Sequence, residues 1–527
     1  MGVEENVQFT AVERALFSGR FTTIATEMGE LLRRMSFSTN IKERLDFSCA
    51  LLDPEGRLLV NAPHIPVHLG ALGLCVRTAV QALEPGPGDV LITNHPAFGG
   101  SHLPDVTVFG PVYHSGERIG YVASRAHHAE IGGKRPGSMP PDAESLAEEG
   151  VVIPPMHLVR AGQPRWKDLE EVLTEGAYPS RLPEENLADL RGALAAHRRG
   201  ETMLQTLAGA TGLRLLRAQM DEIHEASSRR MARALQRHEG LCRTATARLD
   251  DGTLIQVRVE IQDGRATVDF EGSSTVVASN FNATRAIVTS AVLYCLRLLV
   301  GEDLPLNEGL LTPVELRIPE ETFLNPRFEA DPTRCPAVAA GNTETSQRVV
   351  DAVLEALGLC SGGQGTMNNL LYGNERFGTY ETIGGGAGGG PGFRGADGVH
   401  THMTNTRITD AEVLEARYPV RLREFAVRRG SGGAGQWRGG DGLVRELEFL
   451  EDVEVSFLGQ HRREVPFALA GGQPGEVGAQ WIRRRDGRLD PVDGVSVSRL
   501  FAGECFRVET PSGAGYGPPA VPESEDS

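Results

Sequence analysis

Cysteine is scarce in this sequence, and its spacing carries no motif. The 527 residues contain seven cysteines, and no two of them form a CxxC pair. Disulfide-stapled domains need paired cysteines at regular spacing, whereas scattered thiols are typical of a reducing compartment. We therefore expect a fold without a disulfide framework and a cytoplasmic location.

Long apolar runs are missing as well. The longest, such as residues 291–300, are interrupted by charge and fall short of the roughly 18 apolar residues that a membrane span requires. The first residues lack the basic start and apolar middle of a secretory signal. We expect no association with a membrane.

Positive charge is in deficit. Lysine and arginine number 53 against 70 aspartates and glutamates, so the formal net charge is −17. Nucleic acids and anionic membranes bind proteins through a basic footprint, and we expect neither as a partner. A small anionic substrate needs only a local positive site and is not excluded.

Several motifs of nucleotide and covalent chemistry are absent too. The sequence has no GxxxxGK[ST] loop, no GxGxxG between a predicted strand and helix, no GxSxG elbow and no cysteine next to a histidine. These patterns mark phosphate-binding loops and activated nucleophiles. The chain therefore shows no obvious nucleotide site.

Glycine, by contrast, is abundant, with 63 residues that cluster at 384–390, 430–435 and 439–442. A low-complexity linker is one interpretation of such clusters, but their aromatic and charged neighbours favour folded structure. Residues 380–383 and 400–406 flank the first cluster and are candidates for lining a cavity. A second metal at His400 and His402 is an alternative to substrate lining or a subunit contact.

Periodicity predicts three helical regions. Apolar residues at helical spacing predict a helix over residues 11–35 and a helical section near 183–240. A third helix is predicted after Asn342, with Thr343 or Thr345 as its N-cap.

Alternating patterns predict strands in the first and last thirds, so the fold class is α+β with several domains. Strands are expected from about 46 to 159, with a turn at 53–56, and from 443 to 508. A hairpin is expected around Asp263-Gly264. The predicted parts are an α/β region at 1–180, a helical section at 181–250, a mixed region at 251–440, a β-rich region at 441–511 and a flexible tail at 512–527.

Histidine and carboxylate side chains gather on short, glycine-bracketed loops next to predicted strands. His102 and Asp105 are three residues apart, and His127 ends the returning strand. A loop between strands can aim several side chains at one point, and imidazole with carboxylate suits Zn²⁺, Mn²⁺ or Fe²⁺. We interpret these three residues as ligands of one divalent metal, with Asp46 as a candidate fourth.

The spacing also leaves a structural interpretation open. An HxxD pattern is common by chance, and adjacent histidines can be loop residues that are hydrogen-bonded to the backbone. His64 and His68 raise the local histidine count. Either is a candidate substrate ligand or general acid, and a buried structural histidine is the alternative for at least one.

A series of motifs in fixed order identifies a resemblance. They are ERLDFS at 43–48, APHIPVHLG at 62–70, GGSHLPD at 99–105, SRAHHAEIGG at 124–133, PGSM at 136–139, EEGVVIPP at 148–155, GNTETSQR at 341–348, GTMNN at 365–369 and WRGGDG at 437–442. Over nearly its whole length the chain resembles the hydantoinase B/oxoprolinase family.

The resemblance implies a metal site made of one aspartate, the histidine and aspartate of the 99–105 motif, and a histidine of the 124–133 motif. In this sequence the implied ligands are Asp46, His102, Asp105 and His127. His128 is an alternative to His127. Two departures concern the surroundings of the site: residues 94–96 are Asn-His-Pro where Asn-Asp-Pro is usual, and Glu130 stands where aspartate is usual.

The implied function is that of a B-type subunit of an ATP-dependent hydrolase that opens cyclic amides such as 5-oxoproline, hydantoins or lactams. A hydantoinase A-type partner would bind ATP and phosphorylate the substrate oxygen, in a hetero-oligomer with this chain. A divalent metal, Zn or Mn with Fe as a further option, would activate water here, and His64, His68 or Glu130 would act as acid or base. The alternatives are a subunit of a ketone carboxylase of the acetone or acetophenone type, and a non-catalytic scaffold.

Overall fold

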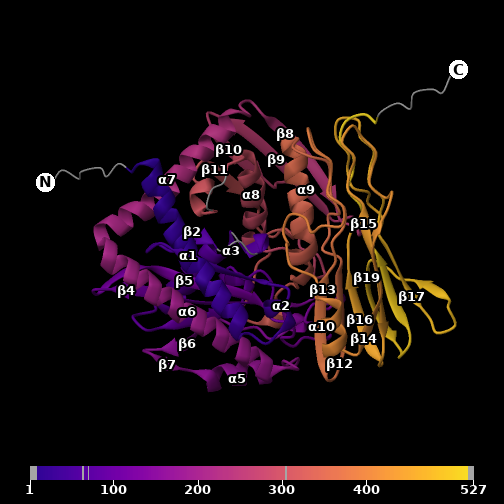
Figure 1. Ribbon diagram of the computed structural model, residues 1–527, viewed down its shortest axis with the longest axis horizontal. Coiled ribbons are helices and arrows are strands. Elements are labelled where there is room, and N and C mark those ends of the chain that lie inside the picture. The colour runs from indigo at the N-terminus through magenta and orange to yellow at the C-terminus, as the bar shows by residue number, and fades with distance from the viewer. Residues whose placement is uncertain (1–8, 62–64, 69, 303–305, 520–527) are drawn as a thin grey trace.

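The computed structural model of the protein describes residues 9–61, 65–68, 70–302 and 306–519. It is a mixed α+β fold with several sheets, as the sequence predicts. Figure 1 shows the C-terminal strands gathered on one side and the remaining sheets and most helices on the other. All seven cysteines lie in the described part and are free thiols. None of the described helices is long and apolar enough to cross a membrane.

A seven-stranded antiparallel sheet organises the first part of the chain. In spatial order its strands are β2 (Leu58–Asn61), β1 (Phe47–Leu52), β5 (Glu117–His127), β4 (Asp105–His114), β3 (Val90–Thr93), β6 (Met156–Arg160) and β7 (Gln163–Pro164). The predicted turn between β1 and β2 is confirmed, since Gly56 donates its N–H to the Asp53 carbonyl. Apart from β7, the strands of this sheet therefore lie in the region, about 46 to 159, for which the alternating pattern predicted strands.

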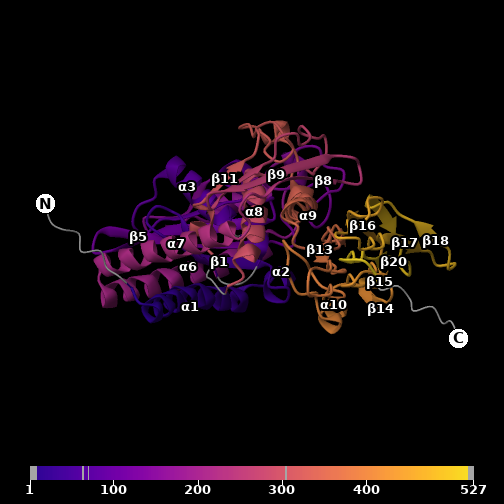
Figure 2. The same ribbon diagram turned by 90° about the horizontal axis from the view of Figure 1, so that it is seen from above.

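Helices cover both faces of this sheet. They are α1 (Ala11–Met35) and α6 (Pro183–Thr211) on one face and α3 (Ala71–Leu83) on the other. Leu51 packs on the α1 and α6 side and Leu52 on the α3 side, as the alternation of a strand requires. Figure 2 shows α1 running beside α6. The prediction of α1 is confirmed, and Thr10 with Glu13 forms a capping box at its start.

A four-stranded sheet and three helices form the middle of the molecule. The strands in order are β11 (Val314–Arg317), β10 (Arg265–Asp269), β9 (Leu254–Gln262) and β8 (Cys242–Arg248), and the helices are α7 (Leu213–Gln236), α8 (Arg285–Val300) and α9 (Ser346–Leu357). The predicted hairpin is confirmed because β9 and β10 pair on either side of Asp263-Gly264. Their apolar residues share one core with α8 and α9.

The helix predicted after Asn342 is present, but both predicted caps are wrong. A π-helix, Gly341–Thr345, leads directly into α9. Thr343 lies inside that π-helix, and Thr345 is already helical at φ −60° and ψ −38°. An N-cap needs extended backbone, so the Thr345 hydroxyl instead donates to the Phe281 carbonyl.

Two further sheets form the C-terminal part. One contains β13 (Phe377–Thr382), β12 (Asn369–Asn374), β16 (Val453–Leu458) and β19 (Val495–Leu500), and the other β14 (Val420–Arg428), β15 (Gly442–Phe449), β20 (Cys505–Glu509), β17 (Ala479–Arg483) and β18 (Leu489–Pro491). Leu370, Phe457 and Phe506 belong to the core that joins the two sheets. The predicted β-rich C-terminal region is confirmed.

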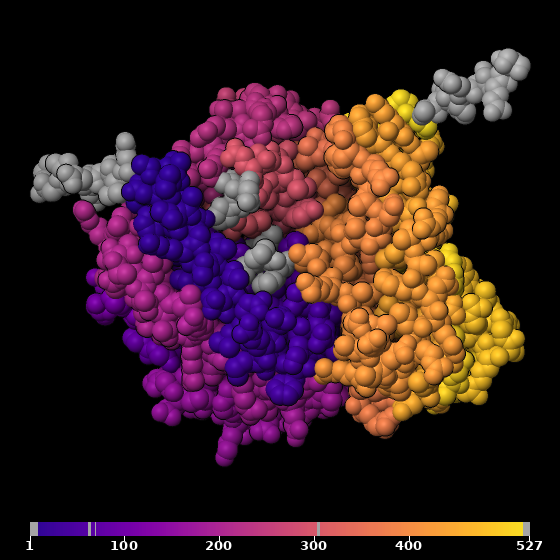
Figure 3. All heavy atoms as spheres, in the orientation of Figure 1, coloured from indigo at the N-terminus to yellow at the C-terminus, as the bar shows by residue number. Residues whose placement is uncertain are grey.

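Short helices connect these layers. They are α2 (Thr39–Lys42), α4 (Leu146–Glu149), α5 (Trp166–Thr174) and α10 (Ala411–Arg417). Arg417 donates to the Phe37 carbonyl, and the Tyr418 hydroxyl contacts Thr39 at 3.0 Å. The C-terminal third therefore docks on the start of the chain, and Figure 3 shows its orange surface meeting the indigo one.

The glycine clusters are packed against one another, so the linker interpretation is wrong. Gly440 donates its N–H to the Ala387 carbonyl, and Gly513 donates to the Gly440 carbonyl. A Cβ at Gly440 would overlap the Ala396 carbonyl oxygen. Glycine is needed here because the backbones of separate segments approach too closely for any side chain.

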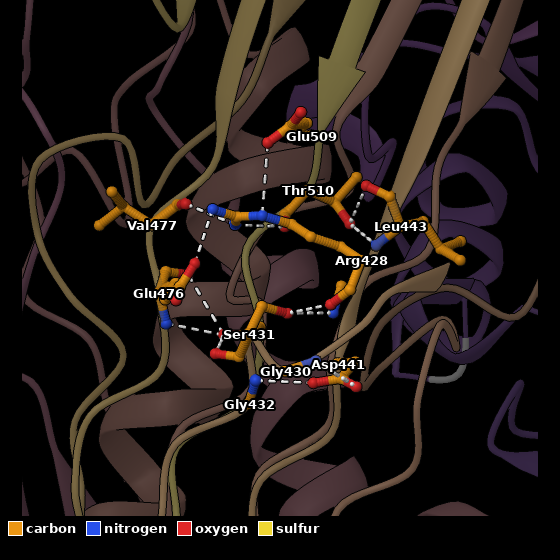
Figure 4. A network of polar contacts seen from close by, with 12 residues as sticks. Arg428, Gly430, Ser431, Gly432, Asp441, Leu443, Glu476, Val477, Glu509 and Thr510 are labelled. Carbon is orange, nitrogen blue, oxygen red and sulfur yellow. Dashed lines mark hydrogen bonds and ion pairs between the residues drawn. The ribbon is translucent and has the colours of Figure 1, made fainter. Parts of the chain in front are cut away.

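Charged side chains anchor the end of this glycine-rich region (Figure 4). Asp441 accepts N–H groups from Gly430 and Gly432 at 3.0 and 2.8 Å. Arg428 donates to Glu476 and contacts Glu509 at 3.4 Å. These contacts join β14, β20 and two glycine-rich loops.

The chain beyond β20 is part of the fold as far as it is described. Ser512 and Ala514 are fully buried, and the Ser512 hydroxyl donates to the Ser431 carbonyl. The flexible tail predicted at 512–527 is therefore wrong for residues 512–519, while residues 520–527 lie outside the described part. The other domain boundaries remain predictions.

Candidate metal centre

Two neighbouring central strands of the first sheet bring the predicted ligands together at one end of the strands. β4 begins at Asp105 and β5 ends at His127, and the sheet register pairs these two residues directly. The loop before β4 carries His102, whose carbonyl accepts the Asp105 N–H. Residues distant in sequence meet here because, in an antiparallel pair, the start of one strand lies next to the end of the other.

The three side chains converge. His102 Nε2 lies 3.3 Å from Asp105 Oδ1, and His127 Nδ1 lies 3.4 Å from the same oxygen. One ligand atom from each residue falls within 4.8 Å of the others, and all three residues are buried. Among the described residues no other group of histidine, cysteine and acidic side chains meets this spacing.

Three polar atoms of this group are buried without a hydrogen-bond partner in the described structure. They are Asp105 Oδ1, His102 Nδ1 and His127 Nε2. Buried polar atoms are normally paired because an unpaired one costs about 1–3 kcal/mol. Unpaired Asp105 Oδ1, facing two imidazoles, fits a divalent cation, and the buried group could bind a metal.

The second oxygen of Asp105 is held by two other side chains. His68 Nε2 lies 3.2 Å from Asp105 Oδ2, and the Ser101 hydroxyl donates to the same oxygen. His68 Nδ1 in turn contacts the Ser48 hydroxyl at 3.0 Å. These contacts orient the carboxylate so that Oδ1 alone faces His102 and His127.

Asp105 and His127 have shifted pKa values. Burial opposes ionisation of Asp105, but the neighbouring imidazoles of His102, His68 and His127 outweigh it and hold its pKa well below the usual range. Burial lowers the pKa of His127, against the opposing effect of Asp105 and Asp46. An ionised carboxylate and a neutral imidazole are the ligand forms of these side chains.

An aromatic ring from the C-terminal part fixes His127 from the other side. The Tyr380 ring stacks on His127 at 4.9 Å between centroids. The Tyr380 hydroxyl donates to Asn369 Oδ1 at 3.0 Å, and Asn369 Nδ2 donates to Glu344 at 2.6 Å. Burial raises the pKa of Glu344 to about 7. The candidate centre therefore lies where the first sheet meets the C-terminal part.

A small cavity opens at the group. The described residues that line it are Asp46, Ile65, Val67, His68, Asp105, His127, Asn342, Met367, Tyr380, Met403 and Thr404. Its volume of about 10 Å³ suffices for one ion or one water. A cyclic amide exceeds this volume. Residues 380–383 and 400–406, predicted as cavity lining, contribute Tyr380, Met403 and Thr404.

Asp46 lies at this cavity but outside the tight group. It precedes β1, and its carbonyl accepts the His127 N–H at 3.0 Å. Its side chain lines the cavity and its charge acts on His127. Its role as a fourth ligand remains a prediction.

His128 and Glu130, the other candidates of the same motif, point elsewhere. His128 Nδ1 lies 3.1 Å from Asn186 Nδ2, so His128 is directed away from the group that contains its neighbour His127. Glu130 accepts the N–H groups of Gly132 and Gly137 and a hydrogen bond from Arg181. These contacts tie the loop after β5 together, and Glu130 is not among the described residues that line the cavity.

Two other described histidines, His402 and His95, make contacts outside the group. His64 lies outside the described residues. His402 Nε2 lies 3.5 Å from Asp351 Oδ1, beside the Arg348–Asp351 ion pair. His95 caps a short turn by accepting the Ala97 N–H.

The family of the chain follows from comparison with known proteins. The family model of hydantoinase B/oxoprolinase matches residues 10–519. The chain belongs to the hydantoinase B/oxoprolinase family. The resemblance drawn from the motifs is thus confirmed.

Known proteins resemble the chain in sequence or in fold. 5-Oxoprolinase 1 of Arabidopsis thaliana is 44% identical over 97% of this chain and 42% of its own length, so the chain spans about two fifths of that relative. The crystal structure of an ATP-dependent caprolactamase from Pseudomonas jessenii is 27% identical with a TM-score of 0.87, covering 97% of this chain and 92% of the other. Acetone carboxylase in its nucleotide-free structure has a TM-score of 0.82 at 17% identity, covering 96% and 75%, which shows a shared fold.

Two residues at the candidate metal centre were not predicted as metal-site residues from the sequence. Tyr380 was expected only as cavity lining, and Asn342 only as the start of a helix. Asn342 lies 240 positions from His102, yet its Nδ2 is 3.2 Å from His102 Nε2. The GNTETSQR motif at 341–348 was the available signal, but a motif alone does not say what its residues touch.

Proposed function

We propose that this chain is the metal-dependent part of an ATP-dependent hydrolase that opens cyclic amides of the 5-oxoproline, hydantoin or lactam type. The observation that carries the proposal is the buried group of His102, Asp105 and His127, whose ligand atoms converge within 4.8 Å beside a cavity of the size of one ion that Asp105 and His127 line. The likeness to a 5-oxoprolinase and to an ATP-dependent caprolactamase supports the choice of substrate class.

The ligand types favour particular metals. Two imidazoles and one carboxylate suit Zn²⁺ or Mn²⁺, with Fe²⁺ as a further candidate. A bound divalent metal supplies Lewis acidity that brings the pKa of water close to neutrality.

The side chains of this chain have distinct proposed tasks around that metal. His68 and Ser101 hold one oxygen of Asp105, which leaves the other oxygen free to ligate. Tyr380 packs flat against His127 and excludes water from that face. Asp46 is the proposed fourth ligand, since it lines the same cavity. His68 has a partner on each nitrogen, which favours positioning over proton transfer to the substrate. A role of His64 as acid or base stays a prediction.

Activation by ATP is proposed to come from a hydantoinase A-type partner. An amide carbon is a poor electrophile until its oxygen carries phosphate. Transfer of the γ-phosphoryl group to that oxygen, addition of water to the carbon and protonation of the ring nitrogen then break the C–N bond. A second water hydrolyses the resulting acyl phosphate to a carboxylate and inorganic phosphate. The absence of a recognised nucleotide motif in the sequence and the greater length of the plant relative support a separate ATP-binding part.

The test is co-expression with an A-type partner, followed by assays of ATP turnover with 5-oxoproline, hydantoins, lactams, and ketones plus bicarbonate. The expected result is ATP hydrolysis with a cyclic amide and formation of its ring-opened acid, lost on metal removal. Turnover only with a ketone and bicarbonate would assign the chain to a carboxylase. Full activity of a His102→Gln variant would show that the chain is a scaffold.

A further inference from the structure

Asn342 is held rigidly next to the candidate metal centre. It belongs to the π-helix Gly341–Thr345, a form that often marks functional sites. Buried Glu149 accepts the N–H groups of Val338 and Ala339 just before this segment. A Cβ at Gly341 would overlap the Asn282 carbonyl. Packing on both sides therefore leaves the Asn342 backbone little freedom.

The side chain of Asn342 is incompletely paired. It is 5% exposed and lines the cavity. Its Nδ2 lies 3.2 Å from His102 Nε2, and its Oδ1 is buried without a hydrogen-bond partner in the part of the chain that is described. One end of this buried amide therefore lacks a hydrogen-bond partner among the described residues, whichever way the amide is turned.

The contact with His102 conflicts with metal binding by that histidine. A neutral imidazole nitrogen has a single lone pair. If His102 Nε2 ligates a metal, it cannot accept the Asn342 N–H as well. The conflict disappears when the amide is turned over, because the oxygen and nitrogen of an asparagine side chain are assigned only from their surroundings. Asn342 Oδ1 then occupies the position 3.2 Å from His102 Nε2.

The resulting distances are those of atoms that share one cation. Ligands about 2.1 Å from a metal lie roughly 3.0–3.4 Å from each other in octahedral or tetrahedral geometry. The distances from His102 Nε2 to Asn342 and to Asp105 Oδ1, and from His127 Nδ1 to Asp105 Oδ1, are 3.2, 3.3 and 3.4 Å. We propose that the side-chain carbonyl of Asn342 is a further ligand of the metal held by these three residues. This inference rests on the proposed metal-dependent function.

A carbonyl oxygen changes which metal the site prefers. Carboxylate and carbonyl ligands suit Mn²⁺, while imidazole suits Zn²⁺ as well. With Asn342 and the proposed ligand Asp46 included, the group has two nitrogen and three oxygen ligands. Removing the amide oxygen should therefore weaken Mn²⁺ binding more than Zn²⁺ binding.

The experiment measures metal binding by the full chain without any assay of turnover. Metal-free wild-type protein, Asn342→Leu and Asn342→Asp are titrated with Mn²⁺ and Zn²⁺ against a competing chelator, and the Co²⁺ absorption spectrum is recorded for each. Asn186→Leu is the matched control, because Asn186 makes the same kind of amide contact, at 3.1 Å, with His128 outside the group. Circular dichroism and thermal melting establish that each variant is folded.

Asn342→Leu is expected to weaken Mn²⁺ binding at least about tenfold, with a smaller loss for Zn²⁺ and a changed Co²⁺ spectrum. Asn342→Asp, which keeps an oxygen and adds charge, is expected to bind Mn²⁺ more tightly than wild type. Asn186→Leu should match wild type. Unchanged affinity and spectrum in folded Asn342→Leu, with metal bound by wild type, would overturn this inference alone. Failure of the wild type itself to bind any of the three metals would overturn it together with the proposed metal-dependent function.

Discussion

Asp105 and His127 face each other as a register pair at the ends of β4 and β5, with Asp105 Oδ1 3.4 Å from His127 Nδ1. They lie 22 positions apart in the sequence, at the two ends of the β4–β5 hairpin, which begins and ends at the same end of the sheet. The pair is buried, so each side chain faces the other and not water. This geometry favours a cation between the ends of β4 and β5. It also distinguishes His127, which faces Asp105, from His128, which contacts Asn186.

Substitution of His127 should remove bound metal, whereas substitution of the adjacent His128 should leave the metal content unchanged. His127→Gln removes a nitrogen that faces Asp105 Oδ1, and we expect loss of at least about 90% of bound metal, since a lost ligand costs well over tenfold in affinity. His128→Gln changes a side chain that contacts Asn186 instead, and metal content should stay at the wild-type level. Elemental analysis of the two purified proteins checks this, and equal metal loss in both would contradict the assignment.

Ser101 should matter for metal affinity more than for folding. Its hydroxyl holds Asp105 Oδ2, and Ser101→Ala would let the carboxylate turn, which typically lowers affinity 10–100-fold. Ser180→Ala, which removes another buried hydroxyl near Asn186, is the control. Chelator competition with Zn²⁺ measures both affinities. Indistinguishable values would mean that packing alone orients Asp105.

The glycine-rich region should tolerate no side chain at Gly440. Gly440→Ala would force apart the segments that carry Ala387 and Ala396, and we expect a loss of about 2 kcal/mol or more in the free energy of unfolding. Gly19→Ala is the matched control, because no described atom lies within 4 Å of a Cβ placed there and alanine favours a helix by up to about 1 kcal/mol. Urea unfolding compares the two variants. A neutral Gly440→Ala would contradict the packed arrangement.

Glu149 should make the protein less stable as pH rises. Burial raises the pKa of its carboxyl to about 8 from its ordinary value of 4.5, so the folded state binds more protons than the unfolded state between these values. Stability attributable to this group is present below about pH 4.5 and is lost as pH rises toward 8, at up to about 1.4 kcal/mol per pH unit.

Glu149→Gln removes this titration while keeping the shape of the side chain. Urea unfolding of both proteins from pH 5 to 8 measures the difference. The variant should gain stability relative to wild type as pH rises, and parallel curves would contradict the assigned pKa.

Local patterns predicted much of the fold. The α1 helix, the turn between β1 and β2 and the β9–β10 hairpin follow from interactions between residues near in sequence. The predictions that were wrong concern residues whose structure depends on contacts with distant parts of the sequence. Thr345 fails as a cap because its hydroxyl finds the Phe281 carbonyl, and residues 512–519 are ordered because Ser512 bonds to Ser431.

The sequence by itself determined which residue types are available at the centre: two histidines and a carboxylate on loops beside strands, in motifs that resemble one family. The two adjacent histidines of the second motif, His127 and His128, remained alternatives. Only the tertiary structure decided which of them faces Asp105, because that depends on how β5 pairs with β4. The contacts of Tyr380 and Asn342 were likewise decided by packing across more than 200 residues, which no local pattern encodes.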